Sequence, residues 1–155
     1  MDTIIPEERL RLRRAELYDA LIIYKWALDR EARINSISGK KFTFEQHYEW
    51  YQGKLKNDHC RIFILEANFP IGQIRFDFKE NLWVISYAID ENFRNQGMGQ
   101  RIVGMGLDLM GRGQYLAKVK RGNMPSIRIF HKLNFREVKE EHANPLVINF
   151  IYEKE

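Results

Sequence analysis

The sequence predicts an α+β fold with one mixed, mostly antiparallel central sheet of about seven strands, flanked by about four helices. Two observations predict this class. Three strand-like runs lie close together between residues 60 and 89, and such short connections require antiparallel hairpins. After Asp90 a helix and a further strand follow, which is the crossover that adds a parallel strand to a mixed sheet. At 155 residues the chain is expected to be a single domain, 1–155.

The composition is that of an ordinary globular domain. Apolar residues make up 45% and charged residues 30%, which excludes disordered, collagen-like and coiled-coil chains. The 25 basic and 21 acidic residues give a net charge of +4, and the basic residues are dispersed, so no nucleic-acid partner is expected. The chain has no apolar run of membrane-spanning length and no secretory signal, so we expect a cytoplasmic protein with no membrane partner.

The cysteine and histidine content argues against a metal centre. Cys60 is the single cysteine, which excludes an intramolecular disulfide and a zinc site built on several thiolates. His59, His131 and His142 have no ligand-like spacing, so they are interpreted as surface or structural residues and no metal is expected. The three tryptophans are interpreted as core residues: Trp26, Trp50 and Trp83.

The chain is predicted to begin with one strand and one helix. Arg and Leu alternate over residues 9–13, which is typical of a strand with one charged face. Apolar residues then recur at helical spacing, which predicts a helix over about 16–29. Residues 34–42 are expected to form a loop.

The next part is predicted to be a helix followed by two hairpins. Thr43 and Gln46 form the Thr-x-x-Gln pattern of a capping box, which predicts a helix from there to about residue 56. Turn residues around Pro70 and Asn81 separate three alternating or apolar runs. The predicted strands are 60–67, 71–78 and 82–89.

The C-terminal half is predicted to contain two helices and three strands. Apolar spacing predicts a helix from Gly97 to about Met110. Asn123 is a predicted N-cap with Pro125 in the first turn of a second helix, and Asn134 is a predicted left-handed residue after it. The predicted strands are 114–120, 135–139 and 146–152.

The segment between the strand at 82–89 and the next helix points to chemistry. It reads Arg94-Asn95-Gln96-Gly97-Met98-Gly99. Its two glycines let the backbone turn tightly and approach a ligand closely. The following helix offers unpaired N–H groups and a positive dipole end, which suit a pyrophosphate, and Arg94 adds a charged donor. A dinucleotide fingerprint is excluded because Ile102 stands where it needs glycine, and no Gly-Lys pair follows at Walker-loop spacing.

A second pattern follows the next strand: Asn123-x-x-Ser126-x-x-x-Phe130-x-Lys132-Leu133-Asn134-Phe135. Together the two segments resemble the GNAT superfamily of acyl-CoA-dependent N-acyltransferases. The pyrophosphate loop of that superfamily usually reads Arg/Gln-x-x-Gly-x-Gly/Ala, and its later pattern reads Asn-x-x-Ser/Ala-x-x-x-Tyr/Phe-x-Lys-x-Gly-Phe. The resemblance is strongest over residues 82–138. It implies the GNAT fold and an acetyl-CoA-dependent N-acetyltransferase that acts on a primary amine by direct transfer in a ternary complex.

The resemblance also implies where acetyl-CoA binds. The strands at 82–89 and 114–120 should splay apart, with the pantetheine arm between them beside the backbone of 87–89. The backbone amides of 96–100 should hold the pyrophosphate. The residues expected at the cofactor are Tyr87, Ala88, Ile89, Arg94, Asn95, Gln96, Gly97, Met98, Gly99, Gln100, Asn123, Ser126, Phe130 and Lys132.

One departure from the family concerns the general acid. Many relatives carry Tyr where Phe130 stands, and that Tyr protonates the departing CoA thiolate. A thiol pKa near 8.5 makes the thiolate a tolerable leaving group without it. Tyr87, Tyr115, Ser126 or a water molecule are the alternative donors.

A second departure concerns the general base. Some relatives place a Glu on the strand at 82–89, at the position that aligns with Val84. The remaining candidates are Asp77, His47 and Glu49, acting directly or through water. Ser86 is a further catalytic candidate, because it lies on the face of that strand that carries only small side chains; this face has room for a substrate or for a closely packed helix.

The N-terminal half is expected to select the acceptor. Its segments Arg33-x-Asn35-Ser36 and His47-x-x-Trp50 resemble the branch that holds ribosomal-protein N-terminal acetyltransferases and nucleotide-sugar amine acetyltransferases, and the second group more. The implied partner is a small-molecule amine, namely the amino group of a nucleotide-linked amino sugar of the pseudaminic-acid type. The residues expected to bind it are Arg30, Arg33 and Arg75, with Lys40 and Lys41 nearby.

Other functions stay open at this point. A protein N-terminal acetyltransferase and a non-catalytic acyl-CoA-binding domain are both compatible with the sequence, and so is an ordinary basic surface at the arginines. The chain is expected to act as a monomer or a homodimer.

Overall fold

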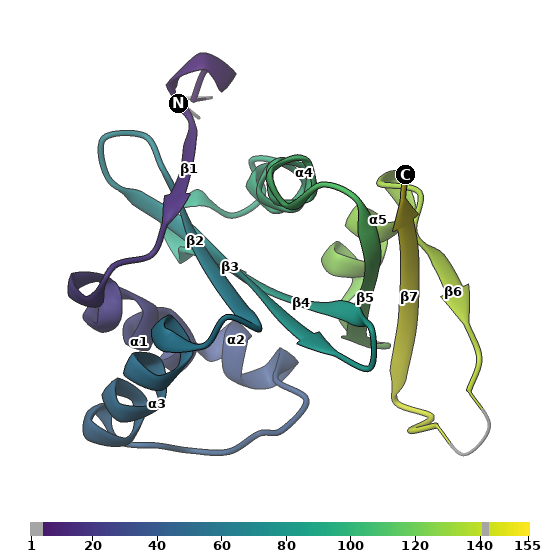
Figure 1. Ribbon diagram of the computed structural model, residues 1–155, viewed down its shortest axis with the longest axis horizontal. Helices are drawn as coiled ribbons and strands as arrows, with labels where there is room; N and C mark the ends of the chain where they lie inside the picture. The colour runs from purple at the N-terminus through teal and green to yellow at the C-terminus, as the bar shows by residue number, and fades with distance from the viewer. Residues whose placement is uncertain (1–4, 141–142) are drawn as a thin grey trace.

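The computed structural model describes residues 5–140 and 143–155, and within them the chain forms seven strands and five α-helices (Figure 1). The strands are β1 (Arg11–Arg14), β2 (Cys60–Glu66), β3 (Pro70–Lys79), β4 (Leu82–Ile89), β5 (Gly113–Lys120), β6 (Arg136–Val138) and β7 (Val147–Lys154). The helices are α1 (Ala20–Leu28), α2 (Arg30–Asn35), α3 (Phe44–Lys56), α4 (Met98–Met110) and α5 (Met124–Lys132). In this part of the chain no helix is long and apolar enough to cross a membrane.

All seven strands belong to one sheet in the order β1-β2-β3-β4-β5-β7-β6. Every neighbouring pair is antiparallel except β4 and β5, which are parallel. The helices cover both faces: α1 and α3 lie on one, and α4 and α5 on the other (Figure 1). The predicted α+β class and mixed sheet are therefore confirmed.

The helices pack on the sheet through two separate apolar clusters. The larger cluster joins β3, β4 and β5 to α4 and α5, and its fully buried members include Phe76, Ile102 and Phe150. The smaller cluster joins β2 to α1 and α3 around Trp26 and Tyr51. Burial of these side chains is the main favourable contribution to folding.

The local signals in the sequence act as predicted. Thr43 Oγ1 accepts a hydrogen bond from the Gln46 N–H, and Gln46 Oε1 accepts one from the Thr43 N–H, so the capping box is formed and α3 begins at Phe44. Asn81 in the β3–β4 turn and Asn134 after α5 have positive φ angles of 68° and 67°. Asn123 caps α5 by accepting from the Ser126 N–H.

The structure differs from the prediction at the N-terminal elements. The strand predicted at 9–13 lies at 11–14, because residues 7–9 form a 3-10 turn. The helix predicted over 16–29 ends at Leu28, because Asp29 has an extended ψ of 142°. Asp29 then caps α2, so residues 34 and 35, which were predicted as loop, are helical.

The predicted roles of the tryptophans and histidines are confirmed in part. Trp26 is buried, but Trp50 is 39% exposed because it covers charged side chains and not the core. His59 and His131 are exposed, as expected. The prediction for His142 lies outside the described residues.

Candidate functional site

The predicted pyrophosphate loop is a tight turn that leads into α4. Gly97 is the N-cap of α4 with φ +77°, in the left-handed region that favours glycine. A Cβ on Gly99 would lie 2.7 Å from Ile129 Cδ1, so any larger residue would require the end of the Ile129 side chain to move. The first N–H groups of this 13-residue helix have no partner inside the helix. The loop therefore fits the phosphate-binding role that the sequence predicts.

β4 and β5 separate beside this loop. Three residues of β4, Trp83 to Ile85, pair with Tyr115 to Ala117 of β5. Both strands continue beyond that point, but no further pair forms between them, although β4 stays paired with β3 as far as Ile89. The predicted splay is confirmed. It leaves the backbone of residues 86–89 with one free edge, which suits the amide groups of a pantetheine arm.

Two hydroxyl groups meet where the strands part. Tyr87 on β4 and Ser126 on α5 lie 2.6 Å apart, Oη to Oγ. Burial raises the pKa of Tyr87, so its phenol stays protonated near neutral pH. Tyr115, another candidate acid, donates to the Gly111 carbonyl at 2.6 Å and is fully buried at the closed end of the strand pair.

Phe130, expected at the cofactor, is part of the core. It is 2% exposed, and its ring centroid lies 5.0 Å from that of Phe135 and 5.7 Å from that of Phe150. The ring also meets Tyr87 edge-on at 6.2 Å. Phe130 therefore packs against the Tyr87 ring and supplies no proton.

The opposite face of β3 and β4 carries a compact charged cluster. Asp77 Oδ1 accepts from Lys54 Nζ at 2.8 Å, and its Oδ2 accepts from Arg75 Nε at 2.8 Å. The guanidinium carbon of Arg75 lies 5.0 Å from the centre of the Trp50 ring. Arg75 pairs with Ser86 in the sheet register, so this cluster borders the separation of β4 from β5.

The carboxylate of Asp77 is too weak a base to deprotonate an amine. Burial opposes its ionisation, but the hydrogen bonds and ion pairs from Lys54 and Arg75 outweigh burial and lower the pKa of Asp77. A carboxylate that is stabilised in this way has little tendency to take a proton from an amine. Asp77 therefore fits better as the residue that orients Arg75.

His47 lies apart from the sheet, between α1 and α3. It is 4% exposed and sits among aromatic rings, stacked on Tyr51 at 6.0 Å and on Phe42 at 5.8 Å. Burial lowers the pKa of His47, although a hydrogen bond to the Ala20 backbone opposes this shift. Within the described part of the chain, its Nε2 atom has no hydrogen-bond partner.

Arg94, expected at the pyrophosphate, is turned towards α2. Its Nη2 donates to Asp29 Oδ2 at 2.6 Å, its Nη1 lies 3.2 Å from Glu31, and its Nε donates to the Ile89 carbonyl. The partner Asp29 was not singled out in the sequence. An Asp directly before a helical segment is an N-cap signal, and the predicted helix ended there, but the short helix that begins at Arg30 was not predicted.

The predicted acceptor arginines have different surroundings. Arg33 donates to the carbonyls of Gly39 and Lys40, so it closes its own loop. Arg30, Lys40 and Lys41 are exposed. The remaining cofactor candidates line the loop and α5, where Gln96 donates to the Asn92 carbonyl and Gln100 and Lys132 are exposed.

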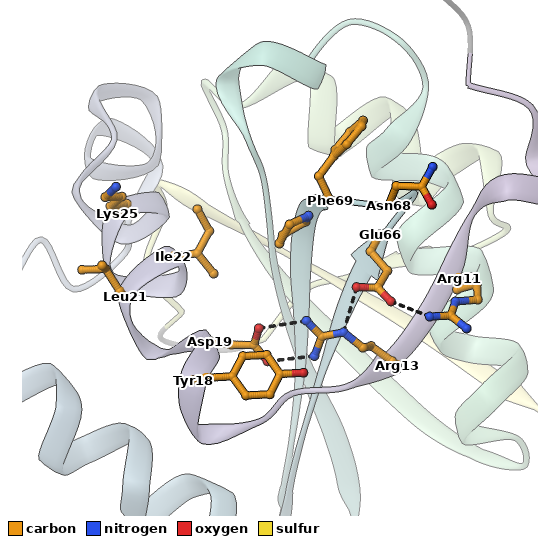
Figure 2. A pocket seen from close by; sticks show the side chains of 11 residues that line it. Arg11, Arg13, Tyr18, Asp19, Leu21, Ile22, Lys25, Glu66, Asn68 and Phe69 are labelled. Atoms are coloured by element: carbon orange, nitrogen blue, oxygen red, sulfur yellow. Dashed lines mark hydrogen bonds and ion pairs between the residues drawn. The ribbon is translucent and has the colours of Figure 1, made fainter.

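A cavity of about 600 Å³ lies elsewhere, between β1, the β2–β3 turn and α1 (Figure 2). Arg13 is one of the residues that line the cavity, and its guanidinium binds both Asp19, at 2.8 Å, and Glu66, at 2.9 Å. Arg11 also reaches Glu66 at 2.9 Å. These ion pairs fasten the edge strand β1 to β2 and α1.

Comparisons with known proteins agree with this geometry. A family model described as "Acetyltransferase (GNAT) domain" matches residues 9–136. The alpha/beta-tubulin-N-acetyltransferase 9 of Mus musculus is 26% identical over 140 residues, covering 74% of this chain and 56% of that protein. This chain thus spans little more than half the length of that curated relative.

Solved structures share the fold at low identity. A spermidine N-acetyltransferase from Vibrio cholerae in complex with CoA and spermine superimposes with a TM-score of 0.82 at 16% identity, covering 96% of this chain and 97% of that one. RimL, a ribosomal L7/L12 alpha-N-protein acetyltransferase in complex with coenzyme A, gives a TM-score of 0.78 at 17% identity, covering 97% of each chain. Since the family model runs from the first strand to the start of β6, this chain belongs to the GNAT family of acetyl-CoA-dependent N-acetyltransferases.

Proposed function

We propose that this chain transfers an acetyl group from acetyl-CoA to the amino group of a nucleotide-linked amino sugar. The observation that carries the proposal is the Arg75 guanidinium on the α1–α3 face. Asp77 holds its Nε, and Trp50 supports its plane. An arginine held in this way can donate two parallel hydrogen bonds from its terminal N–H groups to a phosphate. The nucleotide diphosphate supplies that phosphate.

The charge around the cluster supports an anionic acceptor. Lys54 and Arg75 outnumber the single carboxylate of Asp77, and Arg30, Lys40 and Lys41 add exposed positive charge from the same N-terminal half. A polyamine such as spermidine carries several positive charges and would be repelled here. The acceptors bound by the Vibrio cholerae neighbour are therefore not proposed for this chain.

The low basicity of the candidate protein bases favours an acceptor amine that is itself weakly basic. At pH 7 an amine of pKa near 8 is deprotonated at a cost of about 1 kcal/mol, whereas a lysine-like amine of pKa 10.4 costs nearly 5. Asp77 has a lowered pKa and His47 is buried away from the sheet, so neither is placed to remove that proton. An amine on a sugar ring, flanked by electron-withdrawing oxygens, meets this constraint.

The chain's own residues then perform three tasks. Acetyl-CoA supplies an acetyl group that is already activated as a thioester. The amides at the start of α4 and the free edge of β4 hold the donor, and Arg75 positions the acceptor. As the new C–N bond forms and the C–S bond breaks, the amine loses a proton to solvent. The sulfur gains one from the Tyr87–Ser126 hydroxyl pair.

A kinetic panel tests the proposal. Release of CoA thiol is measured with a UDP-linked 4-amino sugar, the same sugar without its nucleotide, spermidine, and a peptide with a free N-terminus. We expect kcat/KM for the conjugate to exceed that for the free sugar by about a hundredfold, the value of two charge-assisted hydrogen bonds. Equal values for the conjugate and the free sugar would overturn the assignment.

A matched pair of arginine variants sharpens this test. Arg75→Gln should lower kcat/KM for the conjugate and leave the KM for acetyl-CoA unchanged. Arg61 is the control, because its guanidinium also stacks on a tryptophan, at 5.1 Å from the Trp83 ring, but belongs to β2 and the other face of the sheet. Arg61→Gln should leave both constants unchanged.

A protein N-terminus is the second candidate acceptor. It is favoured by the 26% identity to a tubulin N-acetyltransferase and by the fold shared with RimL. An α-amino group of pKa about 8 meets the same deprotonation constraint as the sugar amine. In the panel, a peptide with a higher kcat/KM than every nucleotide sugar supports this candidate. Acetyl-CoA binding without turnover of any amine indicates a non-catalytic domain.

A further inference from the structure

The short helix α2 is held at both ends by residues at the ends of the two parallel strands, β4 and β5. At its start, Asp29 and Glu31 bind Arg94, which follows β4. In its last turn, the Ile34 carbonyl accepts a hydrogen bond from Lys120 Nζ at 2.8 Å, and Lys120 is the last residue of β5. A helix of six residues is about 9 Å long. Since β4 and β5 are parallel, the two anchors come from the ends at which these strands have splayed apart.

The approach to the site divides between the two faces of the sheet. Tyr87 points to the face of α4 and α5, where it meets Ser126 and the first turn of α4. The phosphate-binding amides belong to that same helix. Ala88 points the other way and packs with the α1–α3 cluster. With the donor along α4 and α5, the opposite face, where α2 packs beside α1, is left for the amine.

We propose that Asp29 and Lys120 are positioning residues that hold α2 as a strap over the amine side of the opening. The inference rests on direct acetyl transfer, as proposed above, but not on the identity of the acceptor. It gives Arg94 a role at the acceptor and not at the pyrophosphate. A further link supports it, because Trp26 Nε1 at the end of α1 donates to Asp90 Oδ2, just after β4, at 2.9 Å.

Asp29 performs two tasks that one substitution separates. Its carboxylate caps α2 by accepting from the Ala32 N–H at 3.1 Å, and it also binds Arg94. Asn caps a helix as well as Asp does but carries no charge. Asp29→Asn therefore keeps the cap and weakens only the anchor to Arg94. Lys120→Met keeps the aliphatic stem and removes the other anchor.

The test uses whichever amine the wild-type protein acetylates fastest in the panel, so a wrong acceptor class does not affect it. We expect each variant to raise the KM for that amine about tenfold, as for the loss of one charge-assisted hydrogen bond, with kcat nearly unchanged. The KM for acetyl-CoA should stay within twofold. Glu45→Gln is the control, because Glu45 is an exposed acid in the first turn of α3 and forms no ion pair with any residue that the structure describes.

Hydrogen exchange gives a second measurement that needs no turnover. The amides of residues 31–36 should exchange faster in Asp29→Asn and in Lys120→Met than in the wild type, while those of α3 stay unchanged. Faster exchange together with a raised amine KM supports the strap. An unchanged amine KM and unchanged exchange in both variants would overturn it. An increase confined to the KM for acetyl-CoA would also overturn it, because that result would indicate that Arg94 binds the pyrophosphate.

Discussion

At the scale of single residues, Phe130 stands where many relatives carry a tyrosine, and we propose the Tyr87–Ser126 pair as the proton donor in its place. Phe130 is packed against Phe135 and Phe150, so its ring has a structural role in the core. The Tyr87 phenol and the Ser126 hydroxyl stand beside it at the point where β4 leaves β5. Both residues were among the donors that the sequence left open, but only the structure brings the two together and places Tyr115 at the closed end.

Removal of either hydroxyl should slow transfer without weakening cofactor binding. We expect Tyr87→Phe and Ser126→Ala each to lower kcat by about tenfold to a hundredfold, because general-acid catalysis is worth about 10² to 10⁴ and the thiolate is a tolerable leaving group. Phe130→Tyr should raise kcat only a few-fold. Steady-state kinetics at saturating acetyl-CoA measure these changes. Full activity in both single variants and in the double variant would exclude the pair as the donor.

At the scale of elements, His47 shows how the packing of α1 on α3 responds to pH. Because burial lowers its pKa, folded His47 stays neutral while the unfolded chain takes up a proton below the ordinary value of 6.5. The unfolded state therefore binds more protons in that range, and the free energy of unfolding falls as the pH decreases below about 6.5. The contribution of His47 is fully present above that value.

His47→Phe should keep the aromatic packing and remove this titration. We expect the free energy of unfolding, measured by urea denaturation between pH 7.5 and about 5, to fall less steeply for the variant than for the wild type. Parallel profiles for the two proteins would show that His47 does not titrate on unfolding.

Elements with their own local signal were predictable, and those fixed by distant partners were not. The Thr43 capping box and the turn at Asn81 fix their elements through bonds to near neighbours, which the sequence displays. The helix α2 was not predicted, and its start is held by Arg94, which is 65 residues from Asp29 in the chain. The exposed position of Trp50 on α3 depends likewise on Arg75, which belongs to β3.

At the scale of the whole molecule, the candidate site lies where the parallel strands β4 and β5 stop pairing and separate. The glycine turn before α4, the free edge of β4 and the α2 strap all lie at that separation. The sequence motifs predicted the glycine turn and the helix after it, because neighbouring residues encode such a turn, and its role at the cofactor stays a prediction. The proposed acceptor side combines side chains of α2, α3, β3 and β5, which are far apart in the sequence, so no local pattern predicts their meeting.

The central claim is that acetyl-CoA binds at the turn into α4, and calorimetric titration tests it with two matched alanine variants. Among the described residues, nothing lies within 4 Å of a Cβ placed at Gly97 or Gly53, but Gly97 has φ +77° at the turn into α4 and Gly53 lies within α3. We predict saturable binding to the wild type, at least tenfold weaker binding to Gly97→Ala, because alanine is strained at that φ, and unchanged binding to Gly53→Ala. No binding to the wild type at millimolar acetyl-CoA, or equal affinity for Gly97→Ala and the wild type, would contradict the account.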